Sequence, residues 1–417
     1  MTKQLLRGSL LAAFAILPQL LAAQWSLVRF DEYNFYNRIV TKTADAAIAT
    51  GLDPTGLGSF ILRTNNAGVT WDSIAINGSG GVFNLSQLYF TDVDNGFAGG
   101  LKDNFQIVLS TTDNGSTWID ITPDPASIDQ INIISFVDPD NGFVSDQTNL
   151  FKTTDGGASW TVTQPAFSMR DVKFLNMNLG YGCGTVNPDA VVMKTTDGGI
   201  TWNTVLNAMV PGFSSSSMEK LDAVSADIVF CSAVYSNVIY RTINGGNSWD
   251  TLYLPQIYSV QDYDFISANE GHVLSTMGEI YGTVDGGVTW TLEYAVAGGA
   301  YGPSIYLVSV SFEGATGFVC GSDGLIKKYT NDPTGIQETA TRYTVSPNPL
   351  SSGNVLTIRG VFSSYGVEIF NTNGQLIFKQ DDMSGTGFMS PRLSSGIYSI
   401  VITNSSGSSR QKLVVVD

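Results

Sequence analysis

The nine residues KTTDGGITW, from Lys194 to Trp202, decide the fold, because the same pattern occurs six times in the chain. The other copies are RTNNAGVTW from Arg63, STTDNGSTW from Ser110, KTTDGGASW from Lys152, RTINGGNSW from Arg241 and GTVDGGVTW from Gly282. Successive tryptophans of the pattern are 41 to 47 residues apart. This period is typical of four-stranded sheets that repeat around a ring.

Each column of the repeat has a structural reason. The second position is always Thr, which favours a strand end, and the sixth is always Gly, which adopts a positive φ without steric cost. The fourth position accepts hydrogen bonds from backbone N–H groups in the turn, and it holds Asn66, Asp113, Asp155, Asp197, Asn244 and Asp285. The ninth is expected to fill the gap between neighbouring sheets, and it holds Trp71, Trp118, Trp160, Trp202, Trp249 and Trp290.

The seventh unit is split between the two ends of the chain. A β-hairpin pattern, such as FVDPDNGFVSD from Phe136, precedes most repeats. A last hairpin at 312–321 leads only to Thr330-Asn331-Asp332, the first half of the repeat. The segment QWSLV from Gln24 resembles the strand after the other repeats. We therefore expect the N-terminal strand, with Trp25, to complete the seventh sheet and close the ring.

The six repeats resemble the Asp-box (BNR) repeat of sialidase-like propellers, and with their hairpins they are similar to photosystem II assembly-factor-like propellers. The resemblance covers about residues 24–335. It implies an all-β fold with a seven-bladed β-propeller over residues 24–332. In such propellers the boxes lie on turns away from the usual ligand face, so they imply the fold and little about activity.

The segment 343–417 resembles a type IX secretion sorting domain. The matching residues are Pro347, Asn348, Pro349, Gly374, Gly396, Tyr398 and Lys412. The resemblance implies export by the type IX secretion machinery, removal of the domain, and release or attachment at the outer cell surface. Short alternating runs separated by Asn-Gly and Ser-Gly turns independently predict a small C-terminal antiparallel β-sandwich. Residues 333–342 are the expected linker.

Residues 1–23 are typical of a signal peptide. Lys3 and Arg7 precede an apolar stretch that is too short for a membrane span, and Ala22-Ala23 supply a small-residue cleavage site. We therefore expect a secreted or surface protein with no transmembrane segment. The net charge of −16 argues against nucleic acid and anionic lipid as ligands. A monomer is expected.

Few side chains suit metal binding or nucleophilic catalysis. Cys183, Cys231 and Cys320 include no Cys-x-x-Cys pair, and His272 is the only histidine, so no metal or cofactor is expected. Buried free thiols are predicted, with a Cys183–Cys231 bridge as the alternative. His272 occupies the aromatic slot of its hairpin, which favours packing over a place in a catalytic triad.

A glycoside hydrolase is the enzymatic alternative. A sialidase needs an arginine cluster that the propeller lacks, because Arg63 and Arg241 occupy a repeat slot and are expected at the surface. Other hydrolases need two carboxylates at a suitable separation, and the candidates are Asp129, Asp171, Asp222, Asp264 and Glu279. Most Asp residues have a turn role instead. The pairs Asp92/Asp94 and Asp138/Asp140 resemble half of a calcium loop without its distal Glu.

A binding face is the preferred hypothesis. Loops between blades should gather opposite the Asp boxes, and they carry Phe167, Phe213, Tyr258 and Tyr301, with Arg170 entering the next inner strand. Aromatic rings with a few polar groups suit glycan or protein recognition, although the rings could instead plug the channel mouth. The sequence thus predicts a non-catalytic, exported binding or adhesion propeller. The alternatives are a sialidase-like glycoside hydrolase and an extracellular scaffold or assembly factor.

Overall fold

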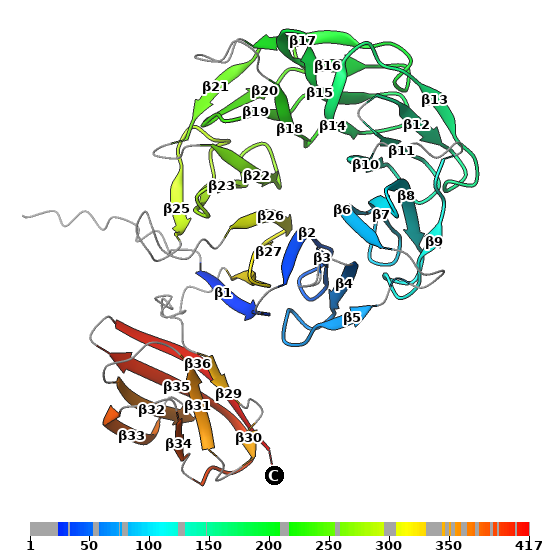
Figure 1. Cartoon of the computed structure of the whole chain (residues 1–417). Coiled ribbons are helices and arrows are strands. Elements are labelled where there is room, and N and C mark those ends of the chain that lie inside the picture. Colours follow the sequence, from blue (N-terminus) through cyan, green and yellow to red (C-terminus); the bar gives the residue numbers. More distant parts are fainter. Residues whose placement is uncertain are drawn as a thin grey trace, which may run out of the picture.

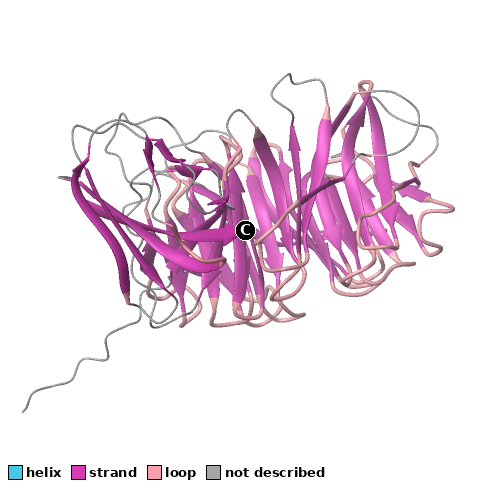
Figure 2. Cartoon of the chain, turned by 90° about the horizontal axis from the view of Figure 1, so that it is seen from below, coloured by secondary structure: helices cyan, strands magenta, loops and turns pink. Residues whose placement is uncertain are grey.

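The computed structural model describes residues 24–416 with short gaps. The gaps are 32–33, 53–57, 75, 77–81, 124–129, 147, 209–216, 255–258, 296–305, 331–343, 347–349, 352–354, 360–364, 372–374, 384–386, 390–391 and 405–406. All the regular secondary structure of the described residues is β-strand (Figure 2). No helix capable of spanning a bilayer occurs among them.

Seven four-stranded antiparallel sheets of the described chain form a ring (Figure 1). Blade 1 contains β2 (Phe35–Thr41), β3 (Ala47–Leu52), β4 (Ser59–Thr64) and β5 (Asp72–Ile74), and blade 2 contains β6 (Phe83–Phe90), β7 (Gly96–Lys102), β8 (Phe105–Thr111) and β9 (Ile119–Asp120). Blade 3 contains β10 (Ile133–Phe136), β11 (Gly142–Ser145), β12 (Leu150–Thr153) and β13 (Thr161–Thr163). Blade 4 contains β14 (Ser168–Phe174), β15 (Gly180–Val186), β16 (Asp189–Thr195) and β17 (Asn203–Ala208).

The second half of the ring repeats this order from the axis outward. Blade 5 contains β18 (Met218–Ala223), β19 (Val229–Ala233), β20 (Val238–Thr242) and β21 (Asp250–Tyr253). Blade 6 contains β22 (Val260–Phe265), β23 (Gly271–Ser275), β24 (Ile280–Thr283) and β25 (Thr291–Tyr294). Blade 7 contains β26 (Leu307–Glu313), β27 (Thr316–Gly321) and β28 (Ile326–Thr330), with β1 (Gln24–Arg29) as its outer strand.

The N-terminal strand closes the ring, as the split repeat predicted. β1 pairs antiparallel with β28, and Trp25 lies opposite Tyr329. The buried Trp25 ring packs edge-on against Phe312 and Tyr329, with ring centroids 5.7 and 5.4 Å apart. Both ends of the propeller sequence therefore share one hydrophobic cluster.

The Asp-box turn fastens the third strand of a blade to the fourth. In the turn of Asp197, the Thr195 hydroxyl donates to the carboxylate at 2.9 Å. The same carboxylate accepts the N–H and the hydroxyl of Thr201 at 2.9 and 2.6 Å. Gly199, at φ +85°, donates its N–H to the Thr195 hydroxyl at 2.9 Å. A residue with a Cβ would be strained in that conformation.

The two Asn boxes keep the same turn with one bond reversed. Asn66 and Asn244 each accept the backbone N–H four residues later at 2.9 Å. Their amide groups then donate to the hydroxyls of Thr70 and Ser248 at 2.8 Å, where an Asp would accept. The turn survives because a hydroxyl can serve as donor or acceptor.

Stacked rings join neighbouring blades. The pairs with ring centroids 3.5 Å apart are Phe97–Phe136, Phe143–Phe174 and Phe230–Phe265. His272 takes the same slot and stacks on Phe312 at 3.8 Å, while its Nδ1 lies 2.9 Å from Glu293. The histidine is therefore a packing residue between blades 6 and 7, as expected.

The first residue of the repeat also joins neighbouring blades. Backbone carbonyls of the next box accept hydrogen bonds from these cations, in the pairs Arg63–Asn114 at 2.9 Å, Lys194–Gly245 at 2.9 Å and Arg241–Gly286 at 2.8 Å. Arg63 and Arg241 are partly exposed, and each also bonds the next blade. A single repeat does not reveal the carbonyl that the neighbouring copy presents.

The C-terminal region forms two packed sheets. One contains β29 (Thr344–Ser346), β31 (Val355–Arg359) and β34 (Gly387–Met389), and the other contains β30 (Leu350–Ser351), β36 (Gly407–Val416), β35 (Gly396–Asn404), β32 (Tyr365–Asn371) and β33 (Leu376–Met383). Leu356 and Ile358 of the first share a core with Val367 and Ile400 of the second, so the sandwich is confirmed. One pair, β30 with β36, is parallel. Its two-residue length is too short for a pattern to predict its direction.

The sorting-motif residues fall partly in this sandwich. Gly396 and Tyr398 lie on β35, and the Tyr398 hydroxyl donates to the Ser394 carbonyl at 2.9 Å. Lys412 lies on β36 opposite Ser399. Pro347, Asn348, Pro349 and Gly374 lie outside the described residues.

Candidate functional site

The innermost strands line the axis of the ring, and six of them have a β-bulge at the same place. The register shifts lie between Tyr36 and Arg38, Leu85 and Gln87, Met169 and Asp171, Met218 and Lys220, Val260 and Asp262, and Leu307 and Ser309. A bulge inserts one unpaired residue and re-aims the side chains after it. Side chains at alternating positions after the bulge then face the axis.

These strands enclose a cavity of about 310 Å³. Its charged lining residues come from blade 1 and blades 4 to 7, and they are Arg38, Asp171, Lys173, Lys220, Asp222, Asp262, Asp264 and Glu313. Blades 2 and 3 contribute mainly apolar or uncharged side chains, namely Gln87, Leu88, Tyr89, Phe90, Ile133 and Ile134. One wall of the channel is therefore charged and the other is largely apolar.

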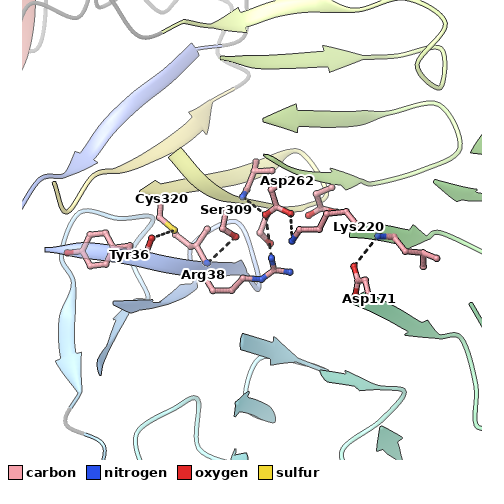
Figure 3. Close-up of polar contacts among 12 residues, drawn as sticks. Tyr36, Arg38, Asp171, Lys220, Asp262, Ser309 and Cys320 are labelled. Carbon is pink, nitrogen blue, oxygen red and sulfur yellow. Dashed lines mark hydrogen bonds and ion pairs between the residues drawn. The ribbon is translucent and has the colours of Figure 1, made fainter. Parts of the chain in front are cut away.

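Asp262 is the centre of the charged wall (Figure 3). It is 3% exposed, and its carboxylate accepts the backbone N–H of Val310 at 3.1 Å. Lys220 lies 3.1 Å and Arg38 3.5 Å from its oxygens. Burial alone would raise its pKa, but the two cations outweigh this effect, so the pKa of Asp262 lies below its usual value.

Three other aspartates of the channel also hold the ring together. Each accepts a backbone N–H from the inner strand of the next blade, in the pairs Asp171–Leu221 at 3.0 Å, Asp222–Phe265 at 2.9 Å and Asp264–Phe312 at 2.6 Å. Serine hydroxyls do the same in the pairs Ser135–Phe174 at 2.9 Å and Ser311–Thr41 at 3.0 Å. Side chains that line the channel thus bond blade to blade.

Asp222 and Asp264 form an electrostatically coupled pair. Burial and the nearby Asp222 charge raise the pKa of Asp264 to about 7. Burial also raises the pKa of Asp222, although Lys173 opposes the shift. The Lys173 amine lies 3.5 Å from the Tyr89 hydroxyl. The Asp264 carboxyl therefore loses its proton near neutral pH.

The predicted ligand-binding residues do not lie together in one described site. Phe167 is only 6% exposed and packs edge-on against Trp202 at 5.4 Å, so most of its ring is used between blades 3 and 4. Arg170 is the bulge residue of β14, with its side chain 40% exposed and 3.7 Å from Glu219, the bulge residue of β18. Phe213, Tyr258 and Tyr301 lie outside the described residues.

Only three of the five candidate glycosidase carboxylates are found in the channel. Asp171, Asp222 and Asp264 line the channel, but Glu279 does not; it accepts the Ser275 hydroxyl at 3.2 Å in the turn after β23. Asp129 lies outside the described residues. The sequence interpretation missed Asp262 and its cations. The position of Asp262 in its repeat could have revealed it, because Asp171 and Asp262 each lie three residues before the Phe that ends an inner strand.

The half calcium loops are turns. Asp92 accepts the N–H groups of Asp94 and Asn95 at 2.9 and 2.8 Å, and it also accepts the Asn95 side-chain amide. Asp138 makes the equivalent bonds. Among the described residues no group of three or more His, Cys, Asp or Glu side chains could hold a metal. These aspartates therefore act as turn acceptors.

Sequence comparison identifies two families. Residues 124–254 and 247–335 match the photosynthesis system II assembly factor YCF48 family. Residues 344–416 match the secretion system C-terminal sorting domain, which indicates secretion or attachment at the outer cell surface. No functionally curated protein matches the chain.

Solved structures agree on the propeller fold. YCF48 bound to a D1 peptide is 16% identical, with a TM-score of 0.59, over 74% of this chain and 97% of that one. YCF48 from Cyanidioschyzon merolae is 16% identical (TM-score 0.57; 74% and 98%), and the GH74 enzyme of Niastella koreensis is 14% identical (TM-score 0.56; 94% and 75%). At these identities the likeness shows the fold alone. Because the family matches span about half of the sequence, the chain belongs to the photosynthesis system II assembly factor YCF48 family.

Proposed function

We propose that the chain is an exported, non-catalytic binding protein whose propeller takes a protein segment or a glycan at the channel mouth opposite the Asp boxes. The sorting domain supports an extracellular site of action. The observation that carries the proposal is the use of the channel carboxylates. Asp171, Asp222 and Asp264 each bond the backbone of the next blade.

Glycoside hydrolysis makes a different demand on such carboxylates. One must protonate the leaving oxygen while the other attacks the sugar or activates a water. Here one oxygen of Asp222 and one of Asp264 already accept N–H groups from β22 and β26. A substrate that recruited those oxygens would loosen the contacts between blades. This cost favours binding over catalysis.

The channel mouth offers polar groups for a ligand. The N–H of Asn114, in an Asp box, donates to the carbonyl of Asp94, in the turn that follows an inner strand. The inner strands therefore end on the face of the ring that carries the Asp boxes, and they begin on the opposite face. The bulge residues near those beginnings include Arg170 and Glu219, whose side chains are partly exposed. Paired groups of both charges suit the amide and carboxyl groups of a polypeptide or the hydroxyls of a glycan.

A protein segment is the favoured ligand. A solved YCF48 of the same fold is bound to a D1 peptide, and this chain belongs to that family. The acidic composition of the chain favours partners with exposed basic groups. A glycan is the alternative ligand, because propellers of this fold also serve carbohydrate-active enzymes such as the GH74 enzyme.

A hydrolase is the second candidate function, and one observation favours it. Asp264 has a pKa of about 7 beside Asp222 in a cavity. Coupled carboxylates with separated pKa values are the usual acid and base of glycosidases. The Asp264→Asn variant separates the two functions, because its amide oxygen can still accept the Phe312 N–H while it cannot act as the acid.

The test places the purified full chain on a glycan array and a peptide array, beside a panel of glycosidase substrates. We expect saturable binding without turnover, and Arg170→Ala should weaken this binding. Lys379→Ala is the control and should leave the binding unchanged, because Lys379 forms an exposed ion pair with Glu368 in the C-terminal sandwich. Turnover that disappears in Asp264→Asn would replace the proposal with the hydrolase. A folded protein that is silent in all three assays would favour the scaffold alternative.

A further inference from the structure

Two of the three cysteines face each other across one contact between blades. Cys183 lies three residues after Gly180 at the start of β15, whereas Cys231 lies two residues after Val229 at the start of β19. Successive side chains of a strand point to opposite faces. The difference of one residue therefore turns Cys183 towards blade 5 and Cys231 towards blade 4.

The environment of the two thiols agrees with this geometry. Both side chains are fully buried, and both belong to the hydrophobic cluster that joins blades 4 and 5, with Tyr181 and Leu221. Burial first, and the neighbouring Cys231 thiol second, raise the pKa of the Cys183 thiol well above its usual value. Both are free, buried thiols in the structure, as the sequence predicted, and they lie in one hydrophobic cluster between the two blades.

Cys320 is different and serves as an internal reference. It lies three residues after Gly317 and is the true counterpart of Cys183. It faces blade 1, where its Sγ lies 3.8 Å from the Tyr36 carbonyl (Figure 3). The chain has three cysteines, so Cys320 has no intramolecular partner left if the other two pair.

We propose that Cys183 and Cys231 form a disulfide bond between blades 4 and 5 when the exported chain folds outside the cytoplasm. Disulfides persist in that oxidising environment and are rare in the cytosol. The bond would link two inner regions of the ring that non-covalent contacts alone otherwise hold. It is independent of the ligand proposed above.

The oxidant is an external disulfide, either of a small thiol such as glutathione or of a thiol-oxidising protein. The thiolate of one cysteine attacks a sulfur of that disulfide, forms a mixed disulfide and releases one thiolate. The second cysteine then attacks the protein sulfur of the mixed disulfide and releases the other thiolate. Two electrons pass to the external disulfide, and its two sulfurs take up the two protons of the cysteines.

The bond has to form before blades 4 and 5 close. The attacking species is the thiolate, and the folded interface both raises the pKa of Cys183 and excludes the oxidant. An unfolded or partly folded chain has neither obstacle. The experiment therefore begins with the reduced, denatured full chain.

The full chain is refolded in a buffer of reduced and oxidised glutathione, quenched with acid, denatured and alkylated. We expect one alkylated thiol per chain, at Cys320, and a linked Cys183–Cys231 peptide pair in the mass spectrum of the digest. Dithiothreitol added to the denatured chain should restore three alkylated thiols, and the chain refolded in its presence should melt at a lower temperature. Three alkylated thiols in the soluble, refolded protein before reduction would overturn the proposal.

Variants separate the proposed pair from random oxidation. Cys320→Ala should retain the linked peptide and leave no alkylated thiol. Cys183→Ala should leave both Cys231 and Cys320 alkylated, with the same melting temperature before and after dithiothreitol. A Cys231–Cys320 or Cys183–Cys320 link in the refolded wild-type protein would show that the facing geometry does not direct the chemistry.

Discussion

The carboxylate of Asp264 accepts the backbone N–H of Phe312 at 2.6 Å, across the contact between blades 6 and 7. Burial, and after it the charge of the neighbouring Asp222, raise the pKa of this carboxyl to about 7. One side chain thus couples the closure of two blades to the protonation of the channel.

This coupling predicts how stability changes with pH. Between pH 4 and 7 the folded chain keeps a proton on Asp264 that the unfolded chain has lost, so the free energy of unfolding falls as the pH rises through that window. Asp264→Asn removes the titration and keeps an acceptor for Phe312. The variant should gain stability relative to wild type from pH 5 to about 7, by about 1.4 kcal/mol for each pH unit, and no further up to pH 8. Urea unfolding at the two pH values tests this; parallel profiles would contradict it.

Asp262 should be the most sensitive charge of the channel. Asp262→Ala leaves Lys220 and Arg38 without their shared partner and the Val310 N–H without its acceptor. Removing one member of a buried ion pair costs about 3–5 kcal/mol. Asp250→Ala is the matched control, because Asp250 pairs with Arg241 at 2.9 Å but its side chain is 57% exposed, and it should cost about 1 kcal/mol or less. Equal urea midpoints for the two variants would contradict the role of Asp262.

The ring and its closure were predictable because the repeat is local. A box such as Lys194 to Trp202 carries its turn, its strand ends and its packing residue within nine positions. The split of the seventh unit left Trp25 without a box, and this indicated the closing strand. The repeat and the closing strand can both be predicted without knowledge of any long-range contact.

The channel was harder to predict because it depends on which side of each inner strand faces the axis. The bulge before Asp171 and Asp262 changes the alternation by one residue, and a bulge leaves no clear mark in a single sequence. Phe167 illustrates the same limit. It immediately precedes β14, so its ring packs into the blade contact instead of staying on an exposed loop.

The Asn boxes predict which changes an Asp box tolerates. Asp197→Asn can make the bonds that Asn66 and Asn244 make, so its melting temperature at pH 7 should stay close to that of wild type. Asp197→Ala loses every acceptor and should melt at a lower temperature. Hydrogen bonds from the Thr201 hydroxyl and N–H lower the pKa of Asp197 to about 2. The stabilisation by the carboxylate is thus complete above pH 4 and is lost as the pH falls towards 2. Calorimetry of the three proteins from pH 7 to 2 tests both statements, and equal melting of the Asn and Ala variants at pH 7 would refute the first.

Trp160 tests the role of the repeat tryptophan between blades. Its ring packs edge-on against Phe136, with centroids 6.5 Å apart, and its indole N–H donates to the carbonyl of Ile121 beyond β9 at 2.8 Å. Trp160→Ala opens a cavity between blades 2 and 3 and should cost roughly 3–5 kcal/mol. Trp160→Phe keeps much of the packing and loses the hydrogen bond, so its cost should be clearly smaller. Urea denaturation of both variants gives the comparison. An alanine variant with an unchanged midpoint would mean that the ring adds nothing to the contact between the blades, and the repeat tryptophan would then need another explanation.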